Sequence, residues 1–121
     1  MIGYESELKN VLYQLGVNSR YCGFGYVVYS VEVMLQDPEA RDCIKIAYLN
    51  VCEKYGVDRV NVERDVRTLI STIWNHGNRD LLEIIAGEAL ERKPRAKEFL
   101  LMLVEYAQKL HATLPVEDIC E

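Results

Sequence analysis

Two stretches of apolar residues with helical spacing follow each other in the middle of the chain. Tyr48, Val51, Cys52 and Tyr55 fall on one face of a first helix. A second helical face is formed by Val62, Val66, Leu69, Ile70 and Ile73. Between them lies Gly56-Val57-Asp58, where Gly56 can adopt a positive φ and Asp58 can cap the following helix. Two amphipathic helices joined by a short turn containing glycine predict a helix-turn-helix over residues 48–75.

The first part of the chain predicts two further helices. Residues 6–15 carry apolar side chains at i, i+3, i+4 and i+7, and Gly16 suits the end of such a helix. After a connection over residues 17–25, residues 26–35 alternate as a strand would. No second segment of comparable quality is available to pair with a strand, and its backbone groups would stay unsatisfied. We therefore predict a helix there.

The remaining pattern completes an all-α domain. Asp37-Pro38 is a typical helix start, and the apolar face that follows continues to Tyr55. After residues 59–75, His76-Gly77-Asn78 ends the helix, and Asp80 can cap a short helix that extends to Leu90. A last helix covers residues 99–110 and is expected to end before Pro115, leaving a frayed acidic segment over residues 116–121. The sequence thus predicts one six-helix domain over residues 1–121.

Composition narrows the class of protein. A chain of 121 residues that is 50% hydrophobic can bury one core. No signal peptide or membrane-spanning run is present, so we expect a cytoplasmic protein without a membrane partner. The four cysteines, Cys22, Cys43, Cys52 and Cys120, lack metal-binding spacing and are expected to be reduced thiols. Catalytic motifs are also absent, so we expect neither an enzyme nor a metal or cofactor.

Charge is unevenly distributed along the chain. The net charge of −5 argues against a general nucleic-acid coat protein. Residues 56–97 hold eight basic and seven acidic side chains, whereas residues 98–121 hold one basic and five acidic side chains. The least acidic part therefore contains both the second helix of the helix-turn-helix and a basic loop over residues 91–97. Such a face can approach phosphate in a salt-dependent manner.

The polar face of residues 59–75 has the chemistry needed to read DNA bases. Arg64 and Arg67 lie one turn apart, and arginine matches the O6 and N7 acceptors of guanine. Glu63 precedes Arg67 by four residues and can orient it or accept from a cytosine amino group. The other candidate base-reading residues are Asn61, Thr68 and Ser71. The alternative interpretation is a solvated helix face with an i, i+4 ion pair.

Two other groups of residues have alternative interpretations. In the basic loop, Arg92, Lys93, Arg95 and Lys97 can contact backbone phosphates, or the loop is simply a soluble connection. Tyr21, Phe24, Tyr26 and Tyr29 can suggest base stacking, but we interpret them as core and edge packing of the second helix. His76 is interpreted as a helix-terminal residue.

One stretch of the sequence, with several shorter motifs around it, resembles a known family. The stretch from Val60 to Asn78, VNVERDVRTLISTIWNHGN, is similar to the recognition helix of the effector domain of the stage-zero sporulation protein A family. The positions that match are Val62, Glu63, Arg64, Arg67, Ile70, Trp74, Gly77 and Asn78. Leu15-Gly16-Val17, Gly23-Phe24, Lys93-Pro94 and Glu98-Phe99 follow in the expected order. The resemblance covers residues 8 to 110.

The resemblance implies a six-helix DNA-binding transcription factor domain that binds double-stranded DNA, with a homodimer on tandem sites. In that family a phosphorylatable receiver precedes the domain. Only a few residues stand before the first predicted helix here, so we expect either a stand-alone relative or a segment of a longer chain. Asn61, Asp65 and Thr68 depart from the family pattern, and Asp65 adds a negative charge. The second hypothesis is therefore an acidic protein-interaction module that modulates a DNA-binding homologue or another protein partner.

Overall fold

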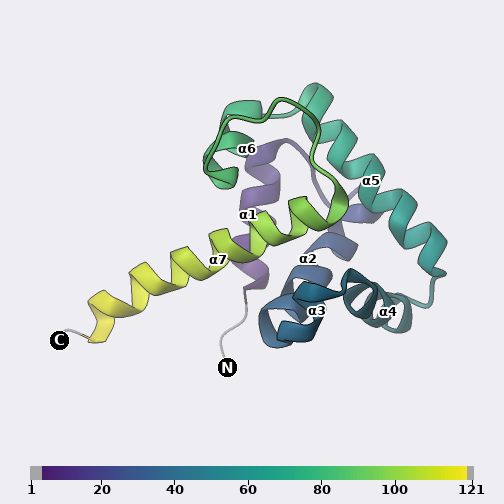
Figure 1. Ribbon diagram of the computed structural model, residues 1–121, viewed down its shortest axis with the longest axis horizontal. Coiled ribbons are helices and arrows are strands. Elements are labelled where there is room, and N and C mark those ends of the chain that lie inside the picture. The colour runs from purple at the N-terminus through teal and green to yellow at the C-terminus, as the bar shows by residue number, and fades with distance from the viewer. Residues whose placement is uncertain (1–3, 120–121) are drawn as a thin grey trace.

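The computed structural model describes the backbone of residues 4–119 and the side chains of residues 4–110 (Figure 1). Over this range the chain forms helices and no strand, so the all-α prediction is confirmed. The helices are α1 (Glu5–Leu15), α2 (Cys22–Gln36), α3 (Pro38–Asp42), α4 (Ile44–Tyr55), α5 (Arg59–His76), α6 (Arg79–Ala86) and α7 (Ala96–Ile119).

Helix α2 is the central element, because α1, α3, α4, α5 and α7 all pack against it (Figure 1). Val27, Val31 and Met34 on α2 are fully buried. A segment with neighbours on several sides is apolar all round, which explains why its pattern also resembled a strand. The helical prediction for residues 26–35 is confirmed, although the helix already begins at Cys22.

The aromatic residues near the start of α2 mainly serve packing. Phe24 and Tyr26 are buried, and Tyr29 packs edge-on against Tyr55 with 6.5 Å between ring centroids. Tyr21 is exposed at the N-cap position. The packing interpretation therefore holds for three of these rings, whereas Tyr21 is on the surface.

The prediction of one continuous helix from Pro38 to Tyr55 is wrong. The chain is extended at Cys43, which separates α3 from α4 and gives seven helices in the described region instead of six. The break lets α3 turn across the end of α2. Arg41 then donates hydrogen bonds to the carbonyl oxygens of Met34 and Leu35, at 2.6 and 3.0 Å. These are carbonyls at the end of a helix, where acceptors would otherwise lack partners.

Helices α4 and α5 form the predicted helix-turn-helix. Helix α4 ends at Gly56, whose φ of 67° is in the left-handed region, and its N–H donates to the carbonyl of Cys52. The turn continues to Asp58 at the N-cap position of α5, but the Asp58 side chain makes no capping hydrogen bond. The turn thus depends on glycine geometry and on packing more than on a side-chain cap.

The end of α5 is fixed to the end of α1. The Asn78 N–H donates to the carbonyl of Leu15 at 3.0 Å, and a Cβ added at Gly77 would overlap that same carbonyl oxygen. The Asn78 side chain also accepts from the Leu81 N–H at 3.0 Å and caps α6. The sequence had assigned that cap to Asp80, and Leu90 to the same helix; α6 instead ends at Ala86.

Helix α7 begins at Ala96 and continues to Ile119, so the prediction that it ends before Pro115 is wrong. A proline removes one backbone donor but does not by itself prevent helical dihedral angles in the residues that follow. Side chains from residue 111 onward, including the predicted acidic segment 116–121, lie outside the described part. In the described part of the chain, no helix is long and apolar enough to cross a bilayer.

The cysteines of the described region are free thiols. Cys22 and Cys43 are exposed, and Cys52 is half-buried in α4. Cys120 lies outside the described residues.

Candidate nucleic-acid interface

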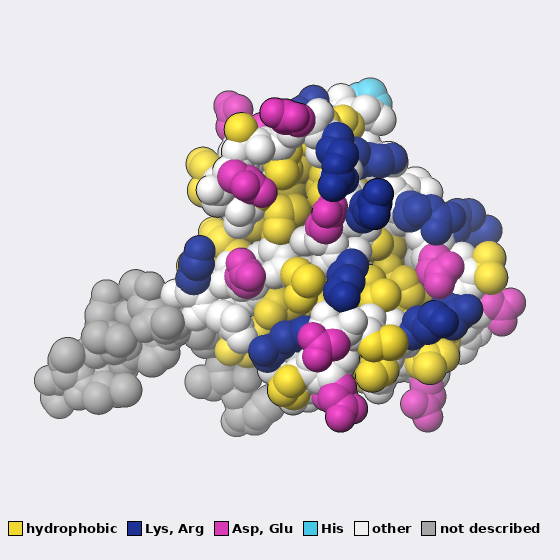
Figure 2. Space-filling view, in the orientation of Figure 1, with side chains coloured by type: hydrophobic (Ala, Val, Ile, Leu, Met, Phe, Trp, Pro, Cys, Tyr) yellow, Lys and Arg dark blue, Asp and Glu magenta, His cyan; other side chains and the backbone are white. Residues whose placement is uncertain are grey.

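Helix α5 has one buried and one exposed face. Its buried residues are Val62, Val66, Leu69, Ile70 and Ile73, as the spacing predicted. On the other side Arg64, Arg67 and Thr68 are exposed, and Asn61, Glu63 and Ser71 are half-buried. Lys and Arg side chains form a band along this helix and the loop that precedes α7 (Figure 2). The six residues predicted to read bases therefore share the side of α5 that faces away from the core.

Glu63 contacts Arg59 and not Arg67, contrary to the expected orienting role. The Arg59 Nε lies 3.4 Å from the Glu63 Oε2. Arg59 and Arg67 are each four residues from Glu63. Side chains on a helix lean toward its N-terminus, and this brings the short Glu63 side chain toward Arg59. Within the described residues, the Arg67 guanidinium has no hydrogen-bond or ion-pair partner. Arg67 is consequently available to an external acceptor.

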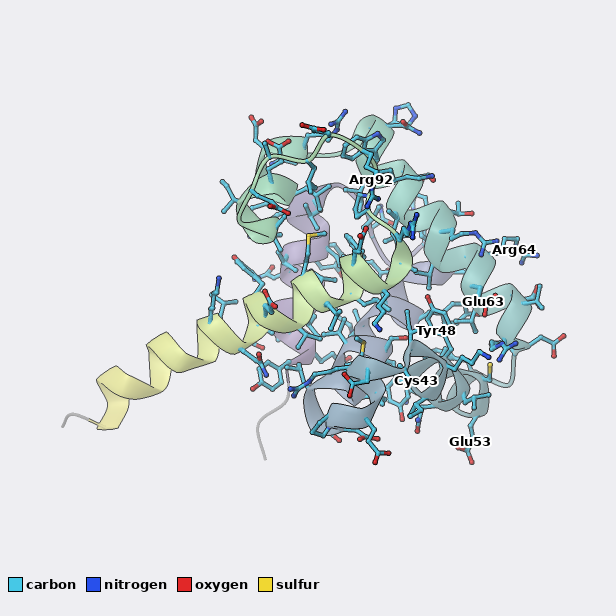
Figure 3. The ribbon with its side chains drawn as sticks, in the orientation of Figure 1. Cys43, Tyr48, Glu53, Glu63, Arg64 and Arg92 are labelled. Carbon is cyan, nitrogen blue, oxygen red and sulfur yellow. The ribbon has the colours of Figure 1, made fainter. Side chains whose placement is uncertain are left out.

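Arg64 is held by its chain neighbour. Its Nε lies 3.4 Å from Asp65 Oδ1, and the Arg64 side chain remains 59% exposed (Figure 3). An exposed pair of this kind contributes about 0–1 kcal/mol. Arg64 can therefore exchange Asp65 for a stronger bidentate acceptor at little cost.

The basic loop is attached to α5 through Lys93. The Lys93 Nζ donates a hydrogen bond to the Ser71 hydroxyl at 2.8 Å, and Pro94 is buried beside it. An open groove of about 410 Å³ runs along this contact. It is lined by Arg64, Arg67, Thr68, Ser71, Thr72, Asn75, His76 and Lys93. A smaller cavity of about 190 Å³ is lined by Arg67, Ile70, Lys93, Pro94, Arg95 and Ala96.

The four predicted phosphate-binding residues divide into two pairs. Lys93 and Arg95 lie beside Arg67, as the cavity lining shows. Arg92 instead faces Glu98, with its two terminal nitrogens 3.3 and 3.2 Å from the carboxylate oxygens (Figure 3). Lys97 donates to the carbonyl of Asp42 at 2.8 Å. Arg92 and Lys97 line neither the groove nor the cavity beside α5, so of these four residues Lys93 and Arg95 are in position to extend the basic surface of α5.

Glu98 organises the loop as it enters α7. Its Oε1 accepts from the Arg95 N–H at 2.8 Å, which is the glutamate half of a capping box. This backbone hydrogen bond, followed by the hydrogen bond from Arg92, lowers the pKa of Glu98 below its usual value of 4.5. The ionised carboxylate thus fixes the conformation from which Lys93 and Arg95 project.

Tyr48 connects α4 to the underside of the interface. It is buried, and its hydroxyl has no hydrogen-bond partner in the described structure (Figure 3). Burial, aided by the negative charge of Glu63 and opposed by the positive charge of Arg67, raises the pKa of Tyr48 to about 12. The phenol therefore stays neutral and packs under the residues that form the exposed face of α5.

The sequence did not single out three residues that line the groove. Thr72, Asn75 and His76 belong to its wall, and His76 had been recognised only as the last residue of α5, which it is. The spacing places two of them on the same face as the predicted residues, because Thr72 follows Thr68 by four residues and Asn75 follows Ser71 by four. Neither residue stood out by charge, and polar residues are common on any helix surface.

These features define the class of protein: a helical domain with a helix-turn-helix whose second helix exposes a partly basic groove. The model of the family described as "Sporulation initiation factor Spo0A C terminal" matches residues 8–107. The chain belongs to this family of DNA-binding effector domains.

Proposed function

We propose that this domain regulates transcription by binding a specific sequence of double-stranded DNA, with α5 in the major groove. The observation that carries the proposal is the groove in which Arg64 and Arg67 of α5 lie beside Lys93 of the loop. An α-helix fits the major groove, where each base pair presents a distinct set of donors and acceptors. The side chains of this groove supply complementary groups.

Each residue of the exposed face matches a particular acceptor or donor. Arg67 has no competing partner in the described structure, and Arg64 has only a weak one, so both can bind guanine in a bidentate manner. Asn61 suits adenine, and Glu63 can accept from the amino group of cytosine. Thr68 and Ser71 have hydroxyl groups that serve either as donors or as acceptors.

Lys93 and Arg95 position the helix by binding the phosphate backbone. The ammonium of Lys93 has three donors, and one donor to Ser71 leaves two for phosphate oxygens. Such contacts fix the register of a protein on the duplex without reading sequence. Besides Arg64 and Arg67, the cations that line the groove and the adjoining cavity are Lys93 and Arg95, so few cations face the phosphates. We therefore expect moderate affinity that depends on salt, with two copies on tandem sites as the family resemblance implies.

Selection of bound duplexes from a random pool, followed by titration of the selected duplex, tests this function. Arg64→Ala and Arg67→Ala should each cost about 1–3 kcal/mol of discrimination between the selected and a scrambled duplex. The fold should persist, because both side chains are exposed. If both variants discriminate as the parent does, α5 is not the reading helix.

A matched pair of lysines tests the phosphate contacts. Lys93→Ala should reduce the slope of log affinity against log salt by about 0.9, the value for one lost phosphate contact. Lys97→Ala should leave the slope unchanged, because that ammonium reaches the Asp42 carbonyl and lines neither the groove nor the cavity beside α5. Equal slopes for the two variants would contradict the assignment. Failure of the parent to select any duplex would favour the alternative of an acidic protein-interaction module.

A further inference from the structure

Val60 is an apolar residue on the exposed face of α5. It lies in the first turn of the helix, and 69% of its surface is exposed. Its position relative to Arg64 and Arg67 is i, i+4 and i+7, so the three residues lie along one line of the helix surface. Val60 thus belongs to the same stripe as the two arginines that are proposed to read bases.

Packing does not account for Val60. The start of α5 is held by Val57, which packs against the core, and by Val62, which is fully buried. Among the described residues, Val60 belongs neither to the core cluster nor to the half-buried residues around it. A β-branched residue is also a weaker helix former than most polar alternatives. The fold therefore gains little from valine at this position.

The major groove contains one apolar group that a valine can recognise, the methyl group on C5 of thymine. Valine has no donor or acceptor, so it cannot pair with the polar edges of the other bases. Residues in the first turn of a recognition helix are those that contact base edges. Val60 and Arg64 are four residues apart, or about 6 Å along the axis, so they address different base pairs.

We propose that Val60 reads the C5-methyl group of a thymine at a base pair adjacent to those read by the arginines. The inference rests on the proposed function and adds to it the chemical group that sets specificity at one end of the helix. Binding would cover the Val60 methyl groups with the thymine methyl and release water from both. Replacing thymine by uracil removes the methyl group and keeps every hydrogen-bonding group.

The test uses the full chain and its selected duplex, with each thymine replaced in turn by deoxyuridine. The parent should lose about three- to tenfold in affinity at one position and little elsewhere, the value of burying one or two methyl-sized groups. Val60→Ser should bind the thymine and uracil duplexes equally at that position. Leu49→Ser is the control: Leu49 is also exposed, at 56%, but lies on α4, so its variant should keep the parent's profile.

The outcomes separate this inference from the proposed function. If the parent binds its selected duplex specifically and no uracil replacement weakens it, Val60 does not read a methyl group, and the DNA-binding function stands. The same conclusion follows if the selected site has no thymine, or if Val60→Ser keeps the uracil sensitivity. If the parent selects no duplex, both proposals are wrong. When the T·A pair at the sensitive position is changed to C·G, replacing that cytosine by 5-methylcytosine should restore part of the affinity, which identifies the methyl group itself.

Discussion

The backbones of α2 and α5 approach each other closely at Gly23, and its replacement by alanine tests how rigidly α5 is held. A Cβ added at Gly23 would overlap the Asp65 carbonyl oxygen and lie 3.0 Å from the carbonyl carbon. It would also lie 3.3 Å from the Cβ of Leu69. Two of these three neighbours are backbone atoms of α5, so the clash cannot be relieved by rotation of a side chain.

The magnitude follows from the contacts. Carbon atoms pack at about 3.5–4.0 Å, so α2 and α5 must separate by something on the order of 0.5–1 Å to admit the methyl group. Overpacking of this kind costs about 1–3 kcal/mol. The gain in helix propensity from Gly to Ala is at most about 1 kcal/mol, and it is smaller in the first turn. After this gain is subtracted, we expect Gly23→Ala to lower the free energy of unfolding by about 0.5–2.5 kcal/mol.

Gly25→Ala is the matched control on the same helix. A Cβ at Gly25 would lie 2.9 Å from the Tyr55 hydroxyl, which is the far end of a side chain that is 43% exposed. That ring can move, so this variant should be neutral or up to about 1 kcal/mol more stable. Urea unfolding of both variants measures the difference. Because Asp65 adjoins Arg64, Gly23→Ala should also weaken binding to the selected duplex. Equal stability of the two variants would refute the close backbone contact.

Two further predictions concern ionisable groups. Tyr48→Phe removes a buried hydroxyl without a partner and should stabilise the domain by about 1 kcal/mol at pH 7. The pKa of Tyr48 in the folded protein, about 12, lies above the usual value of 10. The stability that comes from keeping this phenol neutral is therefore fully present below pH 10, and it is lost as pH rises toward 12. The advantage of the phenylalanine variant should therefore grow in urea unfolding above pH 10. Glu98→Gln should lower the melting temperature at pH 7. The lowered pKa of Glu98 means that this difference persists above pH 4.5 and closes as pH falls through the folded pKa.

Each of these two predictions can be contradicted. For Tyr48, a phenylalanine variant that is less stable at neutral pH would mean that the hydroxyl has a partner. For Glu98, the control is Glu105→Gln, which changes an exposed residue about two turns further along the same helix. If the two glutamine variants have the same melting temperature at pH 7, the negative charge of Glu98 does not strengthen its contacts with the Arg95 N–H and with Arg92.

Much of the fold and part of the interface could be predicted from local spacing. The buried face of α5, the turn at Gly56 and the ends of α1 and α5 were all predicted correctly. These features depend on residues three or four positions apart and on glycine conformation, which the sequence states directly. The exposed position of Arg64 and Arg67 follows from the same periodicity, because residues opposite an apolar stripe face solvent.

Only the tertiary structure decided which charges remain available and where the helices break. Lys93 and Lys97 are indistinguishable in sequence, yet one contacts Ser71, 22 residues away, and the other contacts Asp42, 55 residues away. The break at Cys43 accompanies the contact that Arg41 makes with the end of α2, another contact that helical periodicity does not contain. Periodicity fixes which face of a helix is buried, but partners distant in the chain are chosen by the packing of whole helices. By itself the sequence determined a helix-turn-helix with an arginine face, and the packing of the helices determined which cations that face can offer.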